Sequence, residues 1–234
     1  MPGRWSSRRH AGRRNVNKEQ MTEPNQSSRQ AVRAGRTVVR QVAAWAANGA
    51  SAPARLLGDA RGFVEWAHYP QPDAVDPKSG WRFYYHCHPA SHRPAREHGH
   101  FHIFVPAPRG AARAGNAFSH LVGLSVDARG LPWRLFTTNR WVTEEVWQPV
   151  ADLQRHLAAP RLRRAEPPDV AAWLESLLLL FDEEIAGLLR ARDARLGGGK
   201  RLDDHRLQMP SQRRIDLARR VDALESARCW MSAG

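Results

Sequence analysis

The 234-residue sequence contains only two cysteines and no long hydrophobic run, and both shortages exclude classes of protein. Cys87 and Cys229 lie far apart and form no Cys-x-x-Cys pair, which argues against a disulfide scaffold and against a cysteine zinc site. The longest aliphatic and aromatic run, Leu177–Phe181, is far shorter than the roughly 20 residues of a membrane-spanning helix. We therefore expect a soluble protein without a membrane partner.

Acidic residues and lysines are also scarce relative to arginine. The chain has 36 basic and 23 acidic residues, a net charge of +13, and its only lysines are Lys18, Lys78 and Lys200. The basic residues beyond position 20 are spread over several helix-like segments and form no single stripe, so we interpret them as a solvated surface. Nucleic acid is not an expected partner. No apolar segment follows the arginine pairs near the N-terminus, so no export signal is predicted and a cytoplasmic location is the default expectation.

The composition changes along the chain and predicts four regions. Residues 1–26 are polar and Arg-rich, which predicts a disordered basic tail, and residues 1–20 are one candidate for an over-extended start before Met21. Residues 27–196 are expected to form a single α+β domain. A Gly-rich polar linker over residues 197–210 and a C-terminal helix over residues 211–228 follow.

Hydrophobic periodicity predicts helices at both ends of this domain and strands between them. Helices are expected from Ser28 to Ala47, over 148–158, from an Asp169 cap to Arg195, and from a Ser211 cap onward. Five segments rich in aromatic and β-branched residues are expected to be strands: Phe63–Tyr69, Trp81–His88, His100–Val105, His120–Val126 and Trp133–Thr138. The predicted fold class is α+β, with a central antiparallel meander of about five strands, an N-terminal helix and two to three C-terminal helices.

Histidine is concentrated in the predicted sheet, where eight of the eleven histidines lie between His68 and His120. Successive side chains of a strand point to opposite faces, so the apolar residues of two neighbouring strands take one face. These residues are Trp81, Phe83, Tyr85, Cys87, Phe101, Ile103 and Val105. If the two strands pair, His86, His88, His100 and His102 share the opposite face. Neighbouring strands lie about 4.8 Å apart, so these imidazoles can converge on one ion.

These four histidines are therefore the predicted ligands of a divalent transition metal, for which Zn, Fe, Mn, Ni and Cu are all suitable. Glu97 and His98, in the connecting loop, are the predicted catalytic residues, acting as general acid or base. Four further residues are possible additions to the site: His68, His92, Asn139 and Arg140, the last two as donors to an anionic ligand. The alternative is a polar strand face whose histidines form hydrogen bonds with their neighbours and bind no ligand. Cys87 is expected to be a buried thiol and not a ligand.

Two known metal or catalytic motifs resemble parts of this region. Gly80-x5-His86-x-His88 followed by Gly99 resembles the first half of the cupin metal motif, with His92 where that motif has its glutamate. His98-Gly-His100-Phe-His102-Ile-Phe104 is similar to the motif of the histidine-triad nucleotide hydrolases, with Gly99 in place of an apolar residue. In those hydrolases the middle histidine attacks an α-phosphorus, so the resemblance implies that role for His100.

Over most of residues 28–195 the sequence resembles an uncharacterised bacterial family of domains of unknown function. Four motifs carry the resemblance: Trp66-Ala-His68-Tyr69-Pro70, Tyr84-Tyr85-His86-Cys-His88-Pro89, Glu97-His98-Gly99-His100-Phe101-His102-Ile-Phe104 and Asn139-Arg140-Trp141-Val142-Thr143. The resemblance implies a domain identity and no mechanism.

Three functions follow from these patterns. The leading hypothesis is a metal-binding domain, with a small metalloenzyme acting on an unidentified small molecule as one form of it. The second is a nucleotidyl or phosphoryl hydrolase or transferase that uses His100 without a metal. The third is a non-enzymatic module whose helices bind a partner protein.

Overall fold

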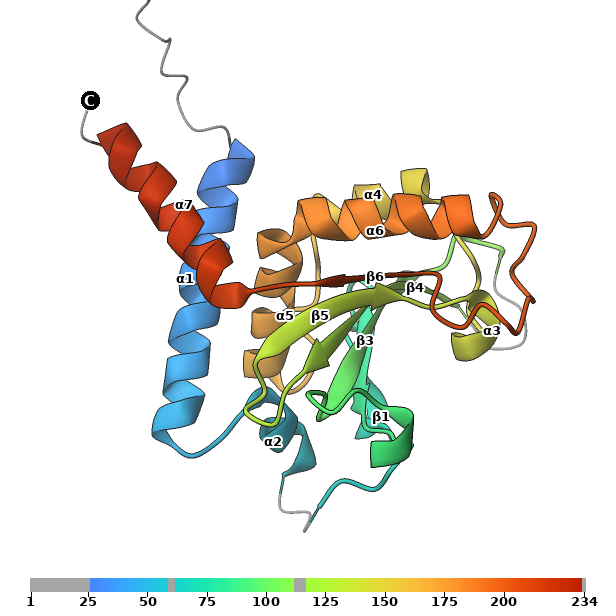
Figure 1. Ribbon diagram of the computed structural model, residues 1–234, viewed down its shortest axis with the longest axis horizontal. Coiled ribbons are helices and arrows are strands. Elements are labelled where there is room, and N and C mark those ends of the chain that lie inside the picture. The colour runs from blue at the N-terminus through green and yellow to red at the C-terminus, as the bar shows by residue number, and fades with distance from the viewer. Residues whose placement is uncertain (1–25, 59–61, 112–116, 233–234) are drawn as a thin grey trace, which may run out of the picture.

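The computed structural model describes residues 26–58, 62–111 and 117–232. Residues 1–25 of the expected disordered tail lie outside the described residues. Six strands form one antiparallel sheet in the order β1-β2-β3-β4-β5-β6, so the predicted α+β class and the meander are confirmed, with one strand more than expected (Figure 1). The strands are β1 Tyr69–Val75, β2 Arg82–His86, β3 Gly99–Pro106, β4 Phe118–Val126, β5 Pro132–Thr137 and β6 Ser211–Arg214. The helices are α1 Gln26–Ala47, α2 Ala52–Leu57, α3 Arg140–Thr143, α4 Val150–Leu157, α5 Pro168–Leu180, α6 Asp182–Arg195 and α7 Leu217–Ser232, and a short 3-10 helix spans Ala90–His92.

Helices cover one face of the sheet and form the hydrophobic core with it. α5 lies against α1 and against the sheet, and for this reason it is apolar almost all around (Figure 1). The Trp173 ring of α5 lies 5.7 Å from Trp45 of α1 and 5.6 Å from Phe101 of β3, which joins the three layers. The predicted apolar strand face, including Phe83, Tyr85, Phe101 and Ile103, is the face that packs on these helices. None of the described helices combines the length and the hydropathy that are needed to cross a bilayer.

The segment Phe63–Tyr69 is not a strand, contrary to the sequence-based expectation. It forms turns, and the first strand is the following segment, Tyr69–Val75, although it contains Pro70 and Pro72. β1 is an edge strand, where a proline that lacks an N–H group does not interrupt the sheet. The aromatic residues that suggested a strand pack instead against each other, with Phe63 and Tyr69 at a ring distance of 4.9 Å.

Two helices of the structure differ in their bounds from the helices that the sequence predicts. The helix expected from Asp169 to Arg195 is divided at Phe181, whose backbone (φ −118°, ψ 27°) leaves the helical region. Asp182, Glu183 and Glu184 then supply the acidic first turn that favours a new helix. Ser211 does not cap the last helix, because Ser211–Arg214 pairs with β5 as strand β6. The Ser211 hydroxyl instead bonds to the Thr137 hydroxyl at 2.6 Å and donates to the Leu188 carbonyl at 2.8 Å, and α7 begins at Leu217.

Candidate metal centre

Three histidines from β2 and β3 meet on the sheet face that the helices do not cover. His86 lies directly opposite His100, and Tyr84 lies opposite His102, so the predicted alternation holds along both strands. One ring nitrogen from each of His86, His100 and His102 lies within 4.8 Å of the other two. His86 Nε2 and His100 Nε2 are only 2.6 Å apart, so a single proton lies between them. His100 and His102 are buried, and His86 is more exposed.

His100 is oriented by a buried ion pair. Its Nδ1–H donates to Glu97 Oε1 at 2.9 Å, which leaves Nε2 directed at His86. The other oxygen of the Glu97 carboxylate accepts from Arg134 at 2.5 Å. Arg134, on β5, also donates to Ser125 Oγ at 3.1 Å and to Gln212 Oε1 at 3.1 Å, so both neighbouring strands, β4 and β6, hold this arginine. A carboxylate on the second nitrogen of a histidine is the arrangement that orients metal-binding imidazoles in many proteins.

His102 is held on its other side by His120 of β4. His102 Nδ1 lies 3.0 Å from His120 Nε2, and both side chains are buried. The backbone N–H of His120 donates to the Glu145 carboxyl group, which follows α3. Tyr84 stacks close to the cluster, with its ring 5.0 Å from that of His102. His102 is therefore enclosed by polar and aromatic groups and does not contact bulk water.

Burial disfavours the protonated form of three of these imidazoles, those of His86, His102 and His120. Desolvation, reinforced by the neighbouring His100, lowers the pKa of His86 to about 2. Burial lowers the pKa of His120 to about 3, and it holds the pKa of His102 well below its usual range. Burial alone would raise the pKa of the Glu97 carboxyl, but the hydrogen bond from His100 and the charge of Arg134 hold it below its usual value. Since only a neutral imidazole has a lone pair for a metal, these shifts favour metal binding at neutral pH.

Phe136 of β5 covers one side of the histidine cluster. Its ring lies 5.2 Å from the ring of His100 and 5.6 Å from that of His102, in edge-to-face contacts. It can approach so closely because the facing residue on β4 is Gly123. A Cβ atom at position 123 would lie 2.2 Å from the Phe136 ring, well inside contact distance.

We therefore expect Gly123→Ala to destabilise the protein by about 1–3 kcal/mol, the usual cost of overpacking a filled site. Gly35→Ala in α1 is the matched control, because a Cβ there would meet its nearest atoms at an ordinary 3.6 Å. The control should be more stable than wild type by about 0.5–1 kcal/mol, as expected for alanine inside a helix. Chemical denaturation of both variants measures the difference. If both substitutions change the free energy of unfolding equally, Phe136 can move away from position 123 without cost.

Two further predicted residues lie at the rim of the cluster. The His88 ring is 4.8 Å from that of His86 and 4.9 Å from that of His100, and it stacks on Trp66 at 4.3 Å. Burial lowers the pKa of His88 to about 4. His68 stacks on Tyr84 at 3.6 Å, and its Nδ1 bonds to Asp73 Oδ1 at 3.0 Å. Both imidazoles are thus next to the cluster, on its more exposed side.

A cavity of about 540 Å³ adjoins this exposed side. Trp66 and His68, which contact the rings of His88 and His86, form one of its walls, and Arg82 of β2 lies at another. The cavity is large enough for a small organic molecule.

The remaining predicted site residues lie elsewhere. His98 does not join His100: its Nδ1 bonds to the Tyr85 hydroxyl at 2.6 Å, and its ring packs on Phe63. His92 is exposed and bonds to Ser91. Asn139 caps α3, and Arg140 pairs with Asp203, so neither faces the histidines. Both oxygens of Glu97 are engaged by His100 and Arg134.

The structure adds residues that the sequence-based search did not select. His120 and Arg134 contact the cluster directly or through Glu97, and Ser125 holds Arg134. A signal was present for Arg134, because it is the one charged side chain inside the apolar strand β5. The signal for His120 was misleading, since strict alternation from Gly123 places it on the other face. A β-bulge opposite the Ile103–Phe104 step reverses the alternation and turns His120 toward His102.

Comparison with known proteins agrees with this description of the domain. Neither a curated protein nor a solved structure matches the chain. The model of one family, described as domain of unknown function DUF6969, matches residues 32–215, which include the whole sheet and the helices from α2 to α6. The matched region covers most of the chain, and it contains every residue of the histidine cluster. The chain is therefore a member of the DUF6969 family.

Proposed function

We propose that the histidine face of the sheet binds one divalent transition metal through His86, His100 and His102. The observation that carries this proposal is the convergence of three imidazoles, each with one ring nitrogen within 4.8 Å of the other two. Ligated nitrogens on a tetrahedral zinc are about 3.3 Å apart, given metal–nitrogen bonds of about 2.0–2.1 Å. The ion would thus take the place of the proton between His86 and His100, and the two rings would separate by less than 1 Å.

The donor set and its surroundings suit such an ion. Three imidazoles bind Zn²⁺ and its neighbours in the transition series, and they leave one coordination position for water or a small molecule. In this proposal Glu97 orients His100 and does not transfer a proton, because both of its oxygens are already engaged. His88, at the rim, is the one predicted ligand that can complete the set from the side of the cavity. A metal-dependent reaction on a small molecule in that cavity is the activity that this arrangement supports best.

The test is the metal content of the purified protein at neutral pH. Plasma mass spectrometry of the wild type should find close to one transition-metal ion per chain. The double variant His100→Ala/His102→Ala should contain almost none. Removal of the ion by a chelator should also lower the melting temperature, since a ligand that binds only the folded state stabilises it.

His92→Ala is the matched control for this experiment. It removes an exposed imidazole of the same loop region that contacts none of the three proposed ligands. The control should keep the metal content of the wild type. The proposal fails if the wild type is metal-free after purification with metal-supplemented buffer, or if chelator leaves the melting temperature unchanged.

A further inference from the structure

A second cavity, of about 510 Å³, lies on the other side of His120, between α3 and the segment that follows α6. Its walls include two indoles, Trp141 and Trp147, and three carboxyl groups, those of Glu144, Glu145 and Asp203. Arg140 is the one basic residue among them, and it is paired with Asp203. An acidic, aromatic lining is unexpected in a chain of net charge +13, so it requires an explanation.

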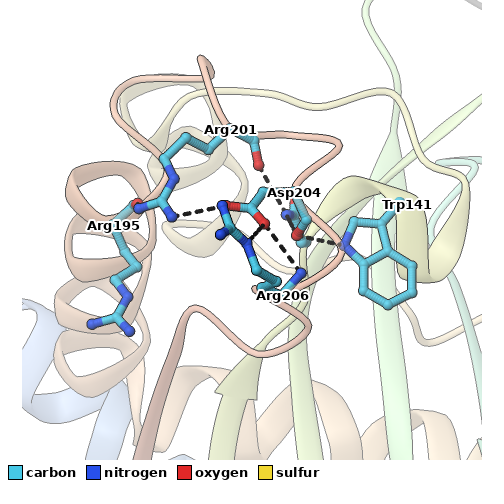
Figure 2. Close-up of polar contacts among 6 residues, drawn as sticks. Trp141, Arg195, Arg201, Asp204 and Arg206 are labelled. Carbon is cyan, nitrogen blue, oxygen red and sulfur yellow. Dashed lines mark hydrogen bonds and ion pairs between the residues drawn. The ribbon is translucent and has the colours of Figure 1, made fainter.

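The two indoles are held firmly in place. Trp141 Nε1–H donates to the backbone carbonyl of Asp204 at 3.2 Å, and Figure 2 shows Arg201 and Arg206 turned toward the carboxylate of the same residue. These arginines hold the pKa of Asp204 well below its usual value, which keeps the contact charged. Trp147 packs on the backbone at Gly199, where a Cβ atom would lie 3.2 Å from the indole. The aromatic walls are therefore formed before any ligand arrives.

Glu145 has an unusual position in this cavity. Its side chain is almost fully buried, with 4% of the residue exposed, and one oxygen accepts the backbone N–H of His120. The other oxygen, Oε1, is buried and has no hydrogen-bond partner among the residues that the structure describes. A buried polar atom that lacks a partner costs about 1–3 kcal/mol, so such atoms are expected where a ligand completes the contact.

Two arginines, on two different helices, act on the carboxyl group of Glu145. Arg140 of α3 and Arg192 of α6 both lie near enough to act on its carboxyl group. Each is already neutralised by its own partner, Arg140 by Asp203 and the buried Arg192 by Asp193 at 2.6 Å. Glu145 itself forms no ion pair with either arginine in the described part of the chain. A positively charged group next to Oε1 would therefore meet a carboxyl group without displacing an existing ion pair.

We propose that this cavity binds a small organic cation, a protonated amine, whose ammonium group donates to Glu145 Oε1 and lies against the indoles of Trp141 and Trp147. Cations bind to the faces of indole rings by electrostatic attraction to the ring. Burial raises the pKa of Glu145 to about 8 in the ligand-free protein, so an ammonium group beside Oε1 favours loss of that proton and then forms a charge-assisted hydrogen bond with the carboxylate. The neutral or anionic analogue of such a ligand has neither interaction. The site is distinct from the proposed metal centre, from which it is separated by His120 and His102.

Three probes of equal size test the proposal: n-butylammonium, n-butanol and butyrate. The readout is the NMR signal of the indole N–H groups in protein labelled at tryptophan nitrogen, since Trp141 and Trp147 line the cavity. We expect n-butylammonium to shift these two signals in a saturable titration. Butanol and butyrate should bind with at most one tenth of the affinity of n-butylammonium. A flat titration with the amine, or equal binding of butanol or butyrate, would overturn the proposal.

Two variants locate the site. Glu145→Gln keeps the acceptor for the His120 N–H but cannot ionise when a cation binds, and we expect it to weaken binding of n-butylammonium at least tenfold. Glu183→Gln, an exposed position on α6, is the matched control and should bind like the wild type. If Glu145→Gln does not fold, Trp141→Leu serves instead, with the same expected loss. Unchanged affinity in a folded Glu145→Gln or Trp141→Leu protein would contradict the assignment of the site.

Discussion

Replacing Arg134 by methionine is expected to destabilise the protein by about 3–5 kcal/mol, the typical cost of removing one partner from a buried ion pair. The side chain of Glu97 is 2% exposed and that of Arg134 is 10% exposed, so water cannot replace the lost partner. Methionine fills a similar volume, and the loss therefore reports the unpaired Glu97 carboxylate more than an empty space. Chemical denaturation at neutral pH measures the change in the free energy of unfolding.

A double variant separates this explanation from a simple packing defect. Arg134→Met/Glu97→Gln removes both charges and keeps an acceptor for the His100 N–H, so it should recover most of the lost stability. If the double variant is as unstable as the single one, the packing of Arg134 on Phe136 and Trp133 matters more than the charge. The metal content of the double variant should fall, because the glutamine no longer holds His100 with a charged oxygen.

The metal-free protein is expected to unfold in mild acid. Burial lowers the pKa values of His86, His120 and His88 to about 2, about 3 and about 4, and that of His102 well below its usual range. Below about pH 6.5 the unfolded chain binds protons at these positions and the folded chain does not, so stability falls as the pH falls. Four such protons, less the one that Glu145 holds only in the folded protein, correspond to about 4 kcal/mol per pH unit between about pH 4.5 and 6.5, which exceeds the reserve of most domains within two units.

The buried carboxyl group of Glu145 has the opposite effect on stability, which it lowers as the pH rises. Burial raises the pKa of its carboxyl group to about 8, so the folded protein holds a proton that the unfolded chain has already lost above about pH 4.5. Stability therefore falls by about 1 kcal/mol per pH unit between pH 6.5 and 8, where the histidines no longer contribute. Together the two effects predict maximum stability between about pH 6 and 7.

Denaturation of chelator-treated protein between pH 4.5 and 8 measures both slopes. His120→Asn should reduce the acid slope by about one third, because it removes one proton from a net difference of three between the unfolded and the folded chain. His92→Asn, at an exposed position that contacts none of the proposed ligands, is the matched control and should keep the wild-type slope. If the free energy of unfolding does not change with pH in acid, the histidines take up protons in the folded state without cost, which would contradict the prediction.

The candidate site was partly predictable because it depends on local geometry. His86, His100 and His102 lie on two strands joined by a short connection, and alternation with a period of two places them on one face. The residues that complete the cluster come from farther along the chain. Whether Arg134 faces Glu97 depends on how β5 pairs with β4 and β6, and no local pattern determines that pairing.

The errors in the predicted elements have a related cause. Phe63–Tyr69 has the aromatic content of a strand, but these side chains pack on one another and on Tyr85 beside the edge of the sheet. The helix over 169–195 has continuous helical periodicity, and the change of direction at Phe181 arises where that buried side chain packs into the core. Ser211 is a good helix cap by residue type, but the free edge of β5 offers a better set of backbone partners.

The amino-acid sequence alone therefore determined the α+β class, the four central strands β2 to β5, and the common face of three histidines. Each of these depends on the periodicity of neighbouring residues, which a single strand or helix already expresses. The tertiary structure alone decided that His120 joins the cluster through a bulge, that Arg134 neutralises Glu97, and that Glu145 lies beside two indoles in a second cavity. These features need strands and loops far apart in the chain to pack together, and their contacts are set by the minimum of the whole molecule's free energy.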